Sequence, residues 1–562
     1  MTDRERAASA TVRKASGAAS PKRPSDPRLG RTEESSGAAG PRTQRWHAPL
    51  GLDALTLDDV RAGVLRGRRV TVLGFARSGV AVARFFADAG AGVTVYDVRA
   101  EGELVDAIAA LQGRPARLML GPEVQPASAW AGADLVVTSP SINPDYPTTE
   151  PRLRHDLAQL RSAMARGEGT VAAILSEPDV VLRLCPAPTI GVTGTKGKTT
   201  TSTLIAEVLA GDPAHPVALG GNMGDPLIDR LLDITPDHRV VIELSELQLP
   251  TLSRGTTVAV YTNVTSDHLD RHGSLEAYRA VKRRLAELVD PGGAVILNAD
   301  DPVVASYAGS GRARAVLYGT RVPAPGGVGV VDGWIVADAV ERLGLAGGGT
   351  GTSATGPGGR VLPLQDLAIP GRHNVSNALA AVATGLLFGV EPPAIRAAVA
   401  GFGGVEHRLE VVAAVAGVRF VNDSQGTQPD AVIAALRAFE PPIVLIAGGR
   451  DKNIDLSALP PVVAERAAAA VLIGESGPHL EAMFRGAGLA RTERAHSLEA
   501  AVERADAIAR ELQAGDPGRP TATVLLSPAA ASFDMFTDYA ARGRAFKDAV
   551  RRLAARRAES EA

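Results

Sequence analysis

The sequence predicts an α/β protein with three domains and a disordered N-terminal tail. The chain has 562 residues, which at roughly 150 residues per domain corresponds to between three and four domains. From Val70 onward, short β-branched segments alternate with helical stretches in three successive series, as in proteins built on parallel sheets. Residues 1–49 contain almost no large apolar side chains and therefore cannot form a core of their own.

Composition excludes several functional classes. The 60 Lys and Arg residues nearly balance 62 Asp and Glu residues, so the chain has no overall basic field for nucleic acid or anionic membranes. Its single cysteine, Cys185, excludes an internal disulfide or a zinc site made of several thiolates. The longest apolar segment, residues 378–390, is interrupted by Thr384 and Gly385 and predicts a buried helix rather than a membrane span. We expect a cytoplasmic monomer.

The tail is the least constrained part of the sequence. Residues 1–49 hold ten Lys and Arg, five Asp and Glu, and many Ser, Ala, Gly and Pro residues. Such a segment buries too little apolar surface to offset its ordering entropy. Two interpretations stay open, a solvated extension and a positively charged segment that binds an acidic partner.

The first α/β series predicts a domain over residues 50–176, with strands at 70–73, 93–96 and 135–138. The turn from Leu73 to Gly79 resembles a dinucleotide-binding fingerprint, and Asp97 follows about 20 residues later. Ala76 stands where the middle glycine belongs, which weakens the case for NAD because that glycine lets the backbone approach a pyrophosphate. The alternatives are a turn without ligand, a nucleotide held differently, and the cofactor site of a nicotinamide-dependent oxidoreductase.

The second series predicts a central domain over residues 177–404. A helix start at Ser176 is followed by strands at 189–193, 240–244, 258–262 and 294–298. Between Val322 and Arg360 the sequence is rich in glycine, which predicts loops or small antiparallel excursions rather than helix.

A phosphate-binding loop is the strongest motif of this domain. The segment from Thr193 to Thr200 reads Thr-Gly-Thr-Lys-Gly-Lys-Thr-Thr and lies between a strand and a helix that ends near Ala210. Such a loop turns backbone N–H groups toward an anion, while Lys198 supplies charge for the β- and γ-phosphates and Thr199 a hydroxyl for Mg²⁺. Gly191 and Gly197 are separated by five residues instead of the usual four, so the prediction depends on the compact segment itself. Glu243 ends a nearby strand, where it would lie beside the metal.

A lysine that points toward the core follows the segment Asp267–His272. In the predicted helix 274–289, Lys282 shares a face with Leu275, Tyr278, Leu285 and Val289. Its stem could cover apolar surface while its amine reaches solvent. Alternatively, burial would leave a neutral amine available for chemistry or modification.

The third series predicts a C-terminal domain over residues 405–562, with strands at 418–422, 443–447, 470–473 and 523–526. Polar residues gather near the strands, in the segments 406–410, 422–424, 448–452 and 527–534. Open α/β sheets bind their ligands at the carboxyl ends of the strands, so together these residues predict a site.

The whole set of motifs resembles the Mur ligases, the ATP-dependent amide-forming family of peptidoglycan synthesis. The resemblance covers the chain from about Val70 to the C-terminus and includes Gly221-Asn-Met-Gly224, His373-Asn-Val-Ser-Asn377 and His407-Arg-Leu-Glu410. Within the family the chain is most similar to members that add glutamate, through the Gly74 turn with Asp97 and the segments 420–424 and 526–536.

This resemblance implies an enzyme that adds D-glutamate to UDP-N-acetylmuramoyl-L-alanine. It implies a Rossmann-like domain for the uridine, a central P-loop-type ATPase domain and a C-terminal Rossmann-like domain for the amino acid. ATP would convert the L-alanine carboxylate to an acyl phosphate, with Mg²⁺, two ions in all, as cofactor. The alternatives are a family member that uses another amino acid or acts on folate, and the oxidoreductase above. The residues alone do not distinguish D- from L-glutamate.

The resemblance also assigns roles to individual residues. Lys198, His268 and Lys282 would be catalytic. One position departs from the family, which commonly has lysine where Gln425 stands, so one positive charge near the amino acid is missing. The implied ligands are ATP for Gly194, Thr195, Lys196, Gly197, Lys198, Thr199, Thr200, Asn374, Asn377, Arg408 and Asp423; the UDP-sugar for Ser78, Asp97, Arg99 and Asn222; glutamate for Thr427, Lys452, Ser532 and Tyr539; one Mg²⁺ for Thr199 and Glu243; and a second for His268 and carbamylated Lys282.

Overall fold

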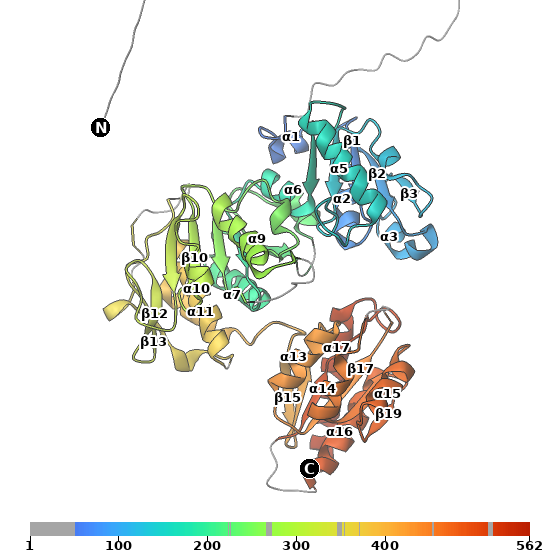
Figure 1. Cartoon of the computed structure of the whole chain (residues 1–562). Helices are drawn as coiled ribbons and strands as arrows, with labels where there is room; N and C mark the ends of the chain where they lie inside the picture. Colours follow the sequence, from blue (N-terminus) through green and yellow to red (C-terminus); the bar gives the residue numbers. More distant parts are fainter. Residues whose placement is uncertain are drawn as a thin grey trace, which may run out of the picture. The chain divides into compact units, whose positions relative to one another are not determined.

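A computed structural model of the chain describes residues 51–222, 224, 226–265, 272–344, 351–352, 355–369, 371–451, 455–514 and 521–561. This part of the chain forms three α/β sheets (Figure 1), which confirms the predicted fold class. The disordered tail predicted for residues 1–49 lies outside the described residues. The domain limits at residues 176 and 404 stay predictions.

The first sheet is parallel throughout, with its described strands in the order β3-β2-β1-β4-β5. Strand order reverses between β1 and β4, and doubly wound sheets bind ligands outside the carboxyl ends of the strands at such a point. The fingerprint turn follows β1, and Asp97 ends β2, so both lie at this edge. The elements are β1 Arg69–Leu73, β2 Gly92–Asp97, β3 Arg117–Leu120, β4 Leu135–Thr138, β5 Ala173–Ser176, α1 Leu57–Arg61, α2 Arg77–Asp88, α3 Val105–Ala109, α4 Pro126–Ala129, α5 Pro151–Ala165 and α6 Glu177–Leu184.

The central sheet is larger, and its described strands run in the order β14-β13-β12-β11-β10-β9-β6-β8-β7. The strands from β7 to β12 pair in parallel, whereas β12, β13 and β14 pair antiparallel. The antiparallel strands lie in the glycine-rich segment, as predicted. The elements are β6 Thr189–Thr193, β7 Val217–Gly221, β8 Arg239–Glu243, β9 Val258–Tyr261, β10 Ala294–Asn298, β11 Arg314–Tyr318, β12 Val328–Val331, β13 Trp334–Ala337, β14 Arg360–Pro363, α7 Lys198–Ala210, α9 Leu275–Leu288, α10 Pro302–Ala305, α11 Arg372–Leu387 and α12 Pro392–Gly401.

The third sheet has the order β15-β16-β20-β17-β18-β19 in the described chain. Its strands are parallel except for β15, which pairs antiparallel with β16 at the edge. The carboxyl ends of β16 and β20 therefore lie next to each other. The elements are β15 Glu410–Val415, β16 Val418–Asn422, β17 Ile443–Gly448, β18 Ala467–Ile473, β19 Thr492–Arg494, β20 Thr523–Leu526, α13 Pro429–Ala438, α14 Leu459–Arg466, α15 Gly477–Gly486, α16 Leu498–Ala514 and α17 Tyr539–Glu561.

Local sequence explains the helices that position the site. The Ser274 hydroxyl accepts a hydrogen bond from the backbone N–H of Ala277 and so begins α9, as an N-cap does. Helix α7 ends at Gly211, the predicted stop. Helix α11 is almost entirely buried from Asn377 onward and packs along α7, which confirms the buried helix predicted for this segment.

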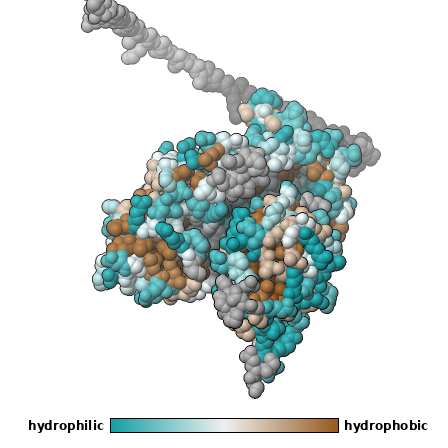
Figure 2. All heavy atoms as spheres, turned by 60° about the horizontal axis from the view of Figure 1, so that its bottom comes forward, coloured by the Kyte–Doolittle hydropathy of each residue, from teal (hydrophilic) through white to brown (hydrophobic). Residues whose placement is uncertain are grey.

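The surface is mixed rather than uniformly apolar. Figure 2 shows a face on which hydrophilic residues predominate and hydrophobic ones form separate groups. Among the described helices, none combines the length and apolar character that crossing a bilayer requires.

Candidate active site

The predicted phosphate loop connects β6 to α7 and depends on two glycines. Gly194 has φ +150°, and a Cβ added there would lie only 1.9 Å from the Thr262 hydroxyl oxygen. Gly197 takes the left-handed conformation, with φ +83°, immediately before α7 begins. Because only glycine enters such conformations at low cost, the loop can curl tightly. The backbone N–H groups at the start of α7 form the positive end of the helix dipole, which is a suitable place for phosphate.

Lys198 lies at the first position of α7, where its amine closes over the loop. The Lys198 Nζ donates hydrogen bonds to the carbonyl oxygens of Gly194, at 3.1 Å, and Thr195, at 2.9 Å. Asn263 supports the loop from the far side, because its carbonyl and side-chain oxygens accept the N–H groups of Thr195 and Lys196. The lysine charge is therefore held at the place where phosphate oxygens would bind.

Oxygen and nitrogen atoms from three elements meet around the Glu243 carboxylate at the end of β8. The Thr199 hydroxyl donates to Glu243 Oε2 at 2.8 Å, and the Asn222 side-chain amide donates to Oε1 at 2.9 Å. Glu243 is only 2% exposed. A hydroxyl beside a buried carboxylate offers the hard oxygen ligands that Mg²⁺ prefers, so the residues present fit this metal.

Lys282 points into the core, as its helical spacing predicts. Its side chain is fully buried, and Nζ donates to the Gly194 carbonyl at 3.0 Å and to the Thr193 hydroxyl at 3.3 Å. The interpretation that the amine reaches solvent is therefore wrong. The amine lies beneath the phosphate loop, and Nζ is 5.5 Å from the centroid of the Tyr278 ring.

The second predicted metal site can be followed only in part. His268, its other predicted ligand, lies outside the described residues. Among the residues that the structure does describe, no three His, Cys, Asp or Glu side chains are grouped in a way that could hold a metal ion.

Helix α11 brings the two predicted adenine-side asparagines to the phosphate loop. The Asn377 side-chain oxygen accepts a hydrogen bond from the Thr201 hydroxyl at 3.0 Å, while its amide donates to Asn374 Oδ1 at 3.1 Å. A Cβ on Gly197 would lie 2.9 Å from the same Asn377 oxygen. The structure thus places both asparagines next to the loop that was predicted to bind ATP.

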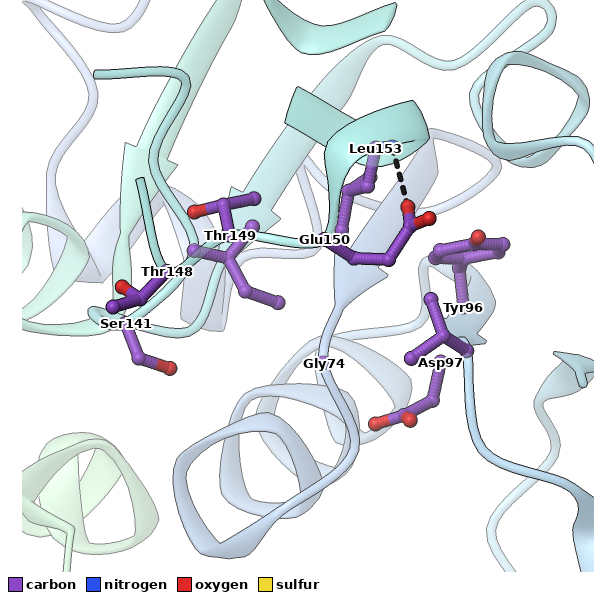
Figure 3. Close-up of a pocket in the computed structure, with 10 residues that line it drawn as sticks. Gly74, Tyr96, Asp97, Ser141, Thr148, Thr149, Glu150 and Leu153 are labelled. Atoms are coloured by element: carbon purple, nitrogen blue, oxygen red, sulfur yellow. Dashed lines mark hydrogen bonds between the residues drawn. The ribbon is translucent and has the colours of Figure 1, made fainter. Parts of the chain in front are cut away.

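A pocket of about 230 Å³ opens at the switch point of the first sheet (Figure 3). Gly74, Tyr96 and Asp97 line it from β1 and β2. The Tyr96 hydroxyl is buried and has no hydrogen-bond partner in the described part of the chain, so its hydrogen-bonding capacity is unused there. The remaining lining residues are Val98, Ser141, Ile142, Thr148, Thr149, Glu150 and Leu153.

The Asp97 carboxylate at this pocket is already fully hydrogen-bonded. One oxygen accepts the backbone N–H and Nε of Arg99, and the other accepts the Phe75 N–H and Arg99 Nη2. Burial opposes its ionisation, but these hydrogen bonds outweigh burial and lower the pKa of Asp97. A carboxylate has about four acceptor positions, so a ligand reaches Asp97 only where the Arg99 side chain moves aside. Ser78, in the first turn of α2, and Arg99 do not line the pocket.

In the third domain, an unusual backbone turn presents Arg408. Its neighbours His407 and Leu409 both have positive φ, at +64° and +45°, although neither is glycine. The buried His407 ring lies 2.9 Å from the Asn422 amide, and the Leu409 N–H donates to Asp423 at 3.2 Å. These contacts hold the turn in place. Because Leu409 is hydrogen-bonded to Asp423, its neighbour Arg408 lies close to Asp423.

The raised pKa of the buried Asp423 carboxylate should make the stability of the fold depend on pH. Burial raises its pKa to about 6, against hydrogen bonds from Ser527 and Leu409 and the charge of Arg408. An unfolded aspartate has a pKa near 3.9, so the folded chain binds this proton more tightly. The contribution of Asp423 to unfolding free energy therefore falls as pH rises from about 4 to about 6, by about 2 to 3 kcal/mol.

We expect Asp423→Asn to gain thermal stability relative to the natural chain across this window. Thermal unfolding in a pH series measures the difference in Tm between the two. The difference should grow from pH 4 to pH 6 and then stay constant; a difference that shrinks over this range would contradict the raised pKa.

The predicted amino-acid residues gather at the carboxyl ends of the third sheet. Thr427 follows β16, Ser532 follows β20, and Tyr539 begins α17, so three separate segments supply them. Lys452 lies outside the described residues. Gln425 lies in the loop after β16, and its N–H donates to the His407 carbonyl.

A cleft of about 730 Å³ involves these residues. Several residues that were predicted to bind ATP, the metal, the UDP-sugar or the amino acid line this cleft. Its lining comprises Arg77, Thr199, Asn222, Gly224, Glu243, Arg408, Leu409, Asp423, Gln425, Gly426, Thr427, Gln428, Ala431, Ala434, Ala435 and Tyr539.

Sequence reasoning missed several residues of these sites. Thr148, Thr149 and Glu150 form one wall of the first pocket, and their only signal is that they follow a strand at the switch point. Asn263, which supports the phosphate loop, follows a strand in the same way. Arg542 gave no signal as a single arginine in a basic helix, yet it is buried beside the amino-acid residues.

Comparisons with known proteins agree with this geometry. Residues 192–385 match the model of the Mur ligase middle domain. Residues 407–530 match that of the Mur ligase glutamate ligase domain. The first match begins just before the phosphate loop, and the second begins at the turn that presents Arg408.

Two relatives align along most of the chain. A UDP-N-acetylmuramoylalanine–D-glutamate ligase of Symbiobacterium thermophilum is 38% identical over 88% of this chain and 100% of its own length. The protein of the same name from Anaeromyxobacter dehalogenans is 39% identical over 86% of this chain and 97% of its own length. A crystal structure of the UDP-N-acetylmuramate-alanine ligase of Thermotoga maritima covers 86% of this chain and 99% of its own, at 21% identity and a TM-score of 0.47.

Proposed function

This chain belongs to the Mur ligase family, and on that premise we propose that it joins D-glutamate to UDP-N-acetylmuramoyl-L-alanine at the expense of ATP. The observation that carries the proposal is the phosphate loop with Lys198 above it and the Thr199–Glu243 pair beside it. The relatives named for D-glutamate addition support the choice of amino acid. The single cysteine and the nucleotide substrates fit a cytoplasmic enzyme, which we propose acts as a monomer.

The chemistry requires an activated carboxylate. In the first step the γ-phosphoryl of ATP passes to an oxygen of the L-alanine carboxylate, which forms an acyl phosphate and ADP. The glutamate amine then attacks the acyl carbon, the amide bond forms, the amine loses a proton, and phosphate leaves. Phosphoryl transfer depends mostly on positioning and charge neutralisation, which Lys198 and the backbone N–H groups at the start of α7 would supply.

Thr199 and Glu243 would hold Mg²⁺, and the ion would neutralise charge on the transferring phosphoryl group. Asn222 fixes the Glu243 carboxylate through its second oxygen. Asn374 and Asn377 would contact the adenine side of ATP, and Arg408 and Asp423 would contact the nucleotide from the third sheet.

A second ion and a carbamate on Lys282 are the finer part of this proposal. Lys282 Nζ lies 3.0 Å from the carbonyl of Gly194 in the phosphate loop. Addition of CO₂ to a neutral amine forms an N–C bond and releases a proton, and the oxygens of the resulting carbamate would be carboxylate-like metal ligands. His268 would be the other ligand of that ion.

Thr427, Lys452, Ser532 and Tyr539 would bind the incoming glutamate. The structure describes three of them, Thr427, Ser532 and Tyr539, and they lie in segments near the carboxyl ends of β16 and β20. Doubly wound sheets bind ligands there.

A substrate panel tests the proposal directly. The chain is given ATP, Mg²⁺ and UDP-N-acetylmuramoyl-L-alanine together with D-glutamate, L-glutamate or other amino acids, and phosphate release is measured. We expect release with D-glutamate and little with the rest. Preference for another amino acid, or turnover with a folate in place of the UDP-sugar, would favour a different ligase of the family. Membership of a ligase family argues against the oxidoreductase alternative.

Asp97→Asn tests the assignment of the first pocket to the UDP-sugar. The amide loses the charge-assisted hydrogen bonds to Arg99 and Phe75, so the pocket loses its fixed wall. We expect the KM for UDP-N-acetylmuramoyl-L-alanine to rise about tenfold, with the KM for ATP unchanged. Asp88→Asn is the matched control, because it removes an exposed ion pair with Arg114 on the same domain. A rise in the KM for ATP alone would contradict the assignment.

A further inference from the structure

Arg542 is the largest side chain that is fully buried in the described chain, although it carries a charge. Its exposed fraction is 1%. A guanidinium has five N–H donors and no acceptor, and burying a charge is costly unless its donors are satisfied. Such a residue is therefore expected to have a defined structural or functional role.

The donors of Arg542 reach only neutral oxygens. Nε donates to the Ser424 hydroxyl and Nη2 to the Ser424 carbonyl, both at 3.0 Å. Nη1 donates to the carbonyls of Ala530, at 3.3 Å, and Ala531, at 3.2 Å. Burial lowers the pKa of Arg542 to about 10, against the charge of Asp534. Because none of these acceptors is a carboxylate, the positive charge is balanced by dipoles rather than by an anion.

The acceptors belong to two loops that leave neighbouring strands. Strands β16 and β20 are parallel, and Asn422 pairs with Leu526 at their carboxyl ends. Ser424 lies three residues before Thr427 on the first loop, and Ala531 immediately precedes Ser532 on the second. The planar guanidinium thus bridges the loops that carry two of the predicted glutamate residues.

The same cluster fixes the third predicted residue. The Ser424 hydroxyl accepts from Arg542 and donates to the Tyr539 carbonyl at 2.7 Å. Ala531 also exchanges backbone hydrogen bonds with Arg450, in the loop after β17. Arg542 therefore lies at the junction of three strand-end loops and the start of α17.

We propose that Arg542 is a positioning residue for the acceptor amino acid. It sets the spacing of the loops that carry Thr427 and Ser532. Its charged guanidinium, which donates to no carboxylate in the described part of the chain, favours an anionic acceptor at this end of the sheet. A buried charge is little screened by solvent or salt. This inference rests on the proposed function. It adds that Arg542 is the residue that favours a dicarboxylate as the acceptor.

Kinetics of Arg542→Met and Arg542→Lys test the proposal. In the Met variant we expect the KM for D-glutamate to rise about tenfold or more, while the KM values for ATP and the UDP-sugar stay within about twofold. Lysine keeps the charge but loses the planar fork, so its KM for glutamate should lie between those of the natural chain and the Met variant. Acyl phosphate formation without glutamate, trapped with hydroxylamine as a hydroxamate, should be unchanged in both.

Two further variants separate positioning from folding. Arg551→Met removes an exposed arginine of the same helix, one that pairs with Asp548, and should leave all three KM values unchanged. Should Arg542→Met fail to fold, Ser424→Ala removes the shared hydroxyl, keeps the charge, and should still raise the KM for glutamate selectively.

An unchanged KM for glutamate would overturn the proposed role of Arg542. An equal rise in all three KM values, together with impaired hydroxylamine trapping, would also overturn it. Either result would leave the proposed function standing. A natural chain that releases no phosphate with glutamate would overturn the proposed function first, before any variant is compared.

Discussion

Lys198→Ala should lower glutamate-dependent phosphate release by about 100- to 1,000-fold, the cost of removing one preorganised charge-stabilising group from an active site. In the structure the lysine amine rests on the carbonyls of Gly194 and Thr195, at the mouth of the loop. The γ-phosphoryl group gains no covalent help in its transfer, so the reaction depends on neutralising its charge. Loss of this amine removes the charge that the first helical residue holds over the loop. Phosphate release at saturating substrates measures the effect.

Two variants make this result specific. Lys198→Arg keeps the charge with a different shape and should recover only part of the activity. Glu207→Ala alters an exposed charge on the same helix, far from the loop, and should turn over normally. Near-normal turnover of Lys198→Ala would overturn the proposed function, because the proposed phosphoryl transfer depends on neutralising the phosphate charge.

The strands that the sequence predicted best are those whose side chains are all buried. Residues 189–193, 294–298 and 523–526 form fully buried strands with the predicted bounds, because continuous burial in a parallel sheet selects β-branched and apolar residues throughout. Strands β3 and β7 were not predicted. Every residue of β3 is at least partly exposed, and β7 alternates between partly exposed and buried residues and ends in two glycines, so neither strand is a continuous apolar segment.

Some residues of the candidate site are determined by local sequence, whereas others depend on contacts between distant segments. The phosphate loop is a contiguous motif, and the inward direction of Lys282 follows from helical spacing, so both could be predicted. Arg542 reaches Ser424 across 118 residues, and the loop at Thr148 faces Tyr96 only because β4 lies beside β1. Contacts of that kind depend on sheet order, which no local pattern encodes.

Lys282 carries the second of the two largest predicted effects. We expect Lys282→Ala to lower glutamate-dependent phosphate release by about 100-fold or more, as the loss of one preorganised group at an active site does. Its amine is fully buried and lies 3.0 Å from the Gly194 carbonyl, so the loss falls on the phosphate loop itself. Lys282→Met keeps most of the volume and separates the loss of the amine from the loss of packing.

The proposed carbamate would give this lysine a dependence on CO₂ that a plain ammonium lacks. In buffer depleted of CO₂ the natural chain should lose activity and regain it when bicarbonate is added, whereas Lys282→Met should stay inactive in both. Labelled ¹³C-bicarbonate should produce a carbamate carbon signal in the natural chain and none in the variant. Full activity with an unmodified Lys282 would contradict the carbamate yet leave the phosphate loop intact, because Lys282 would then act through its amine and the Gly194 carbonyl alone.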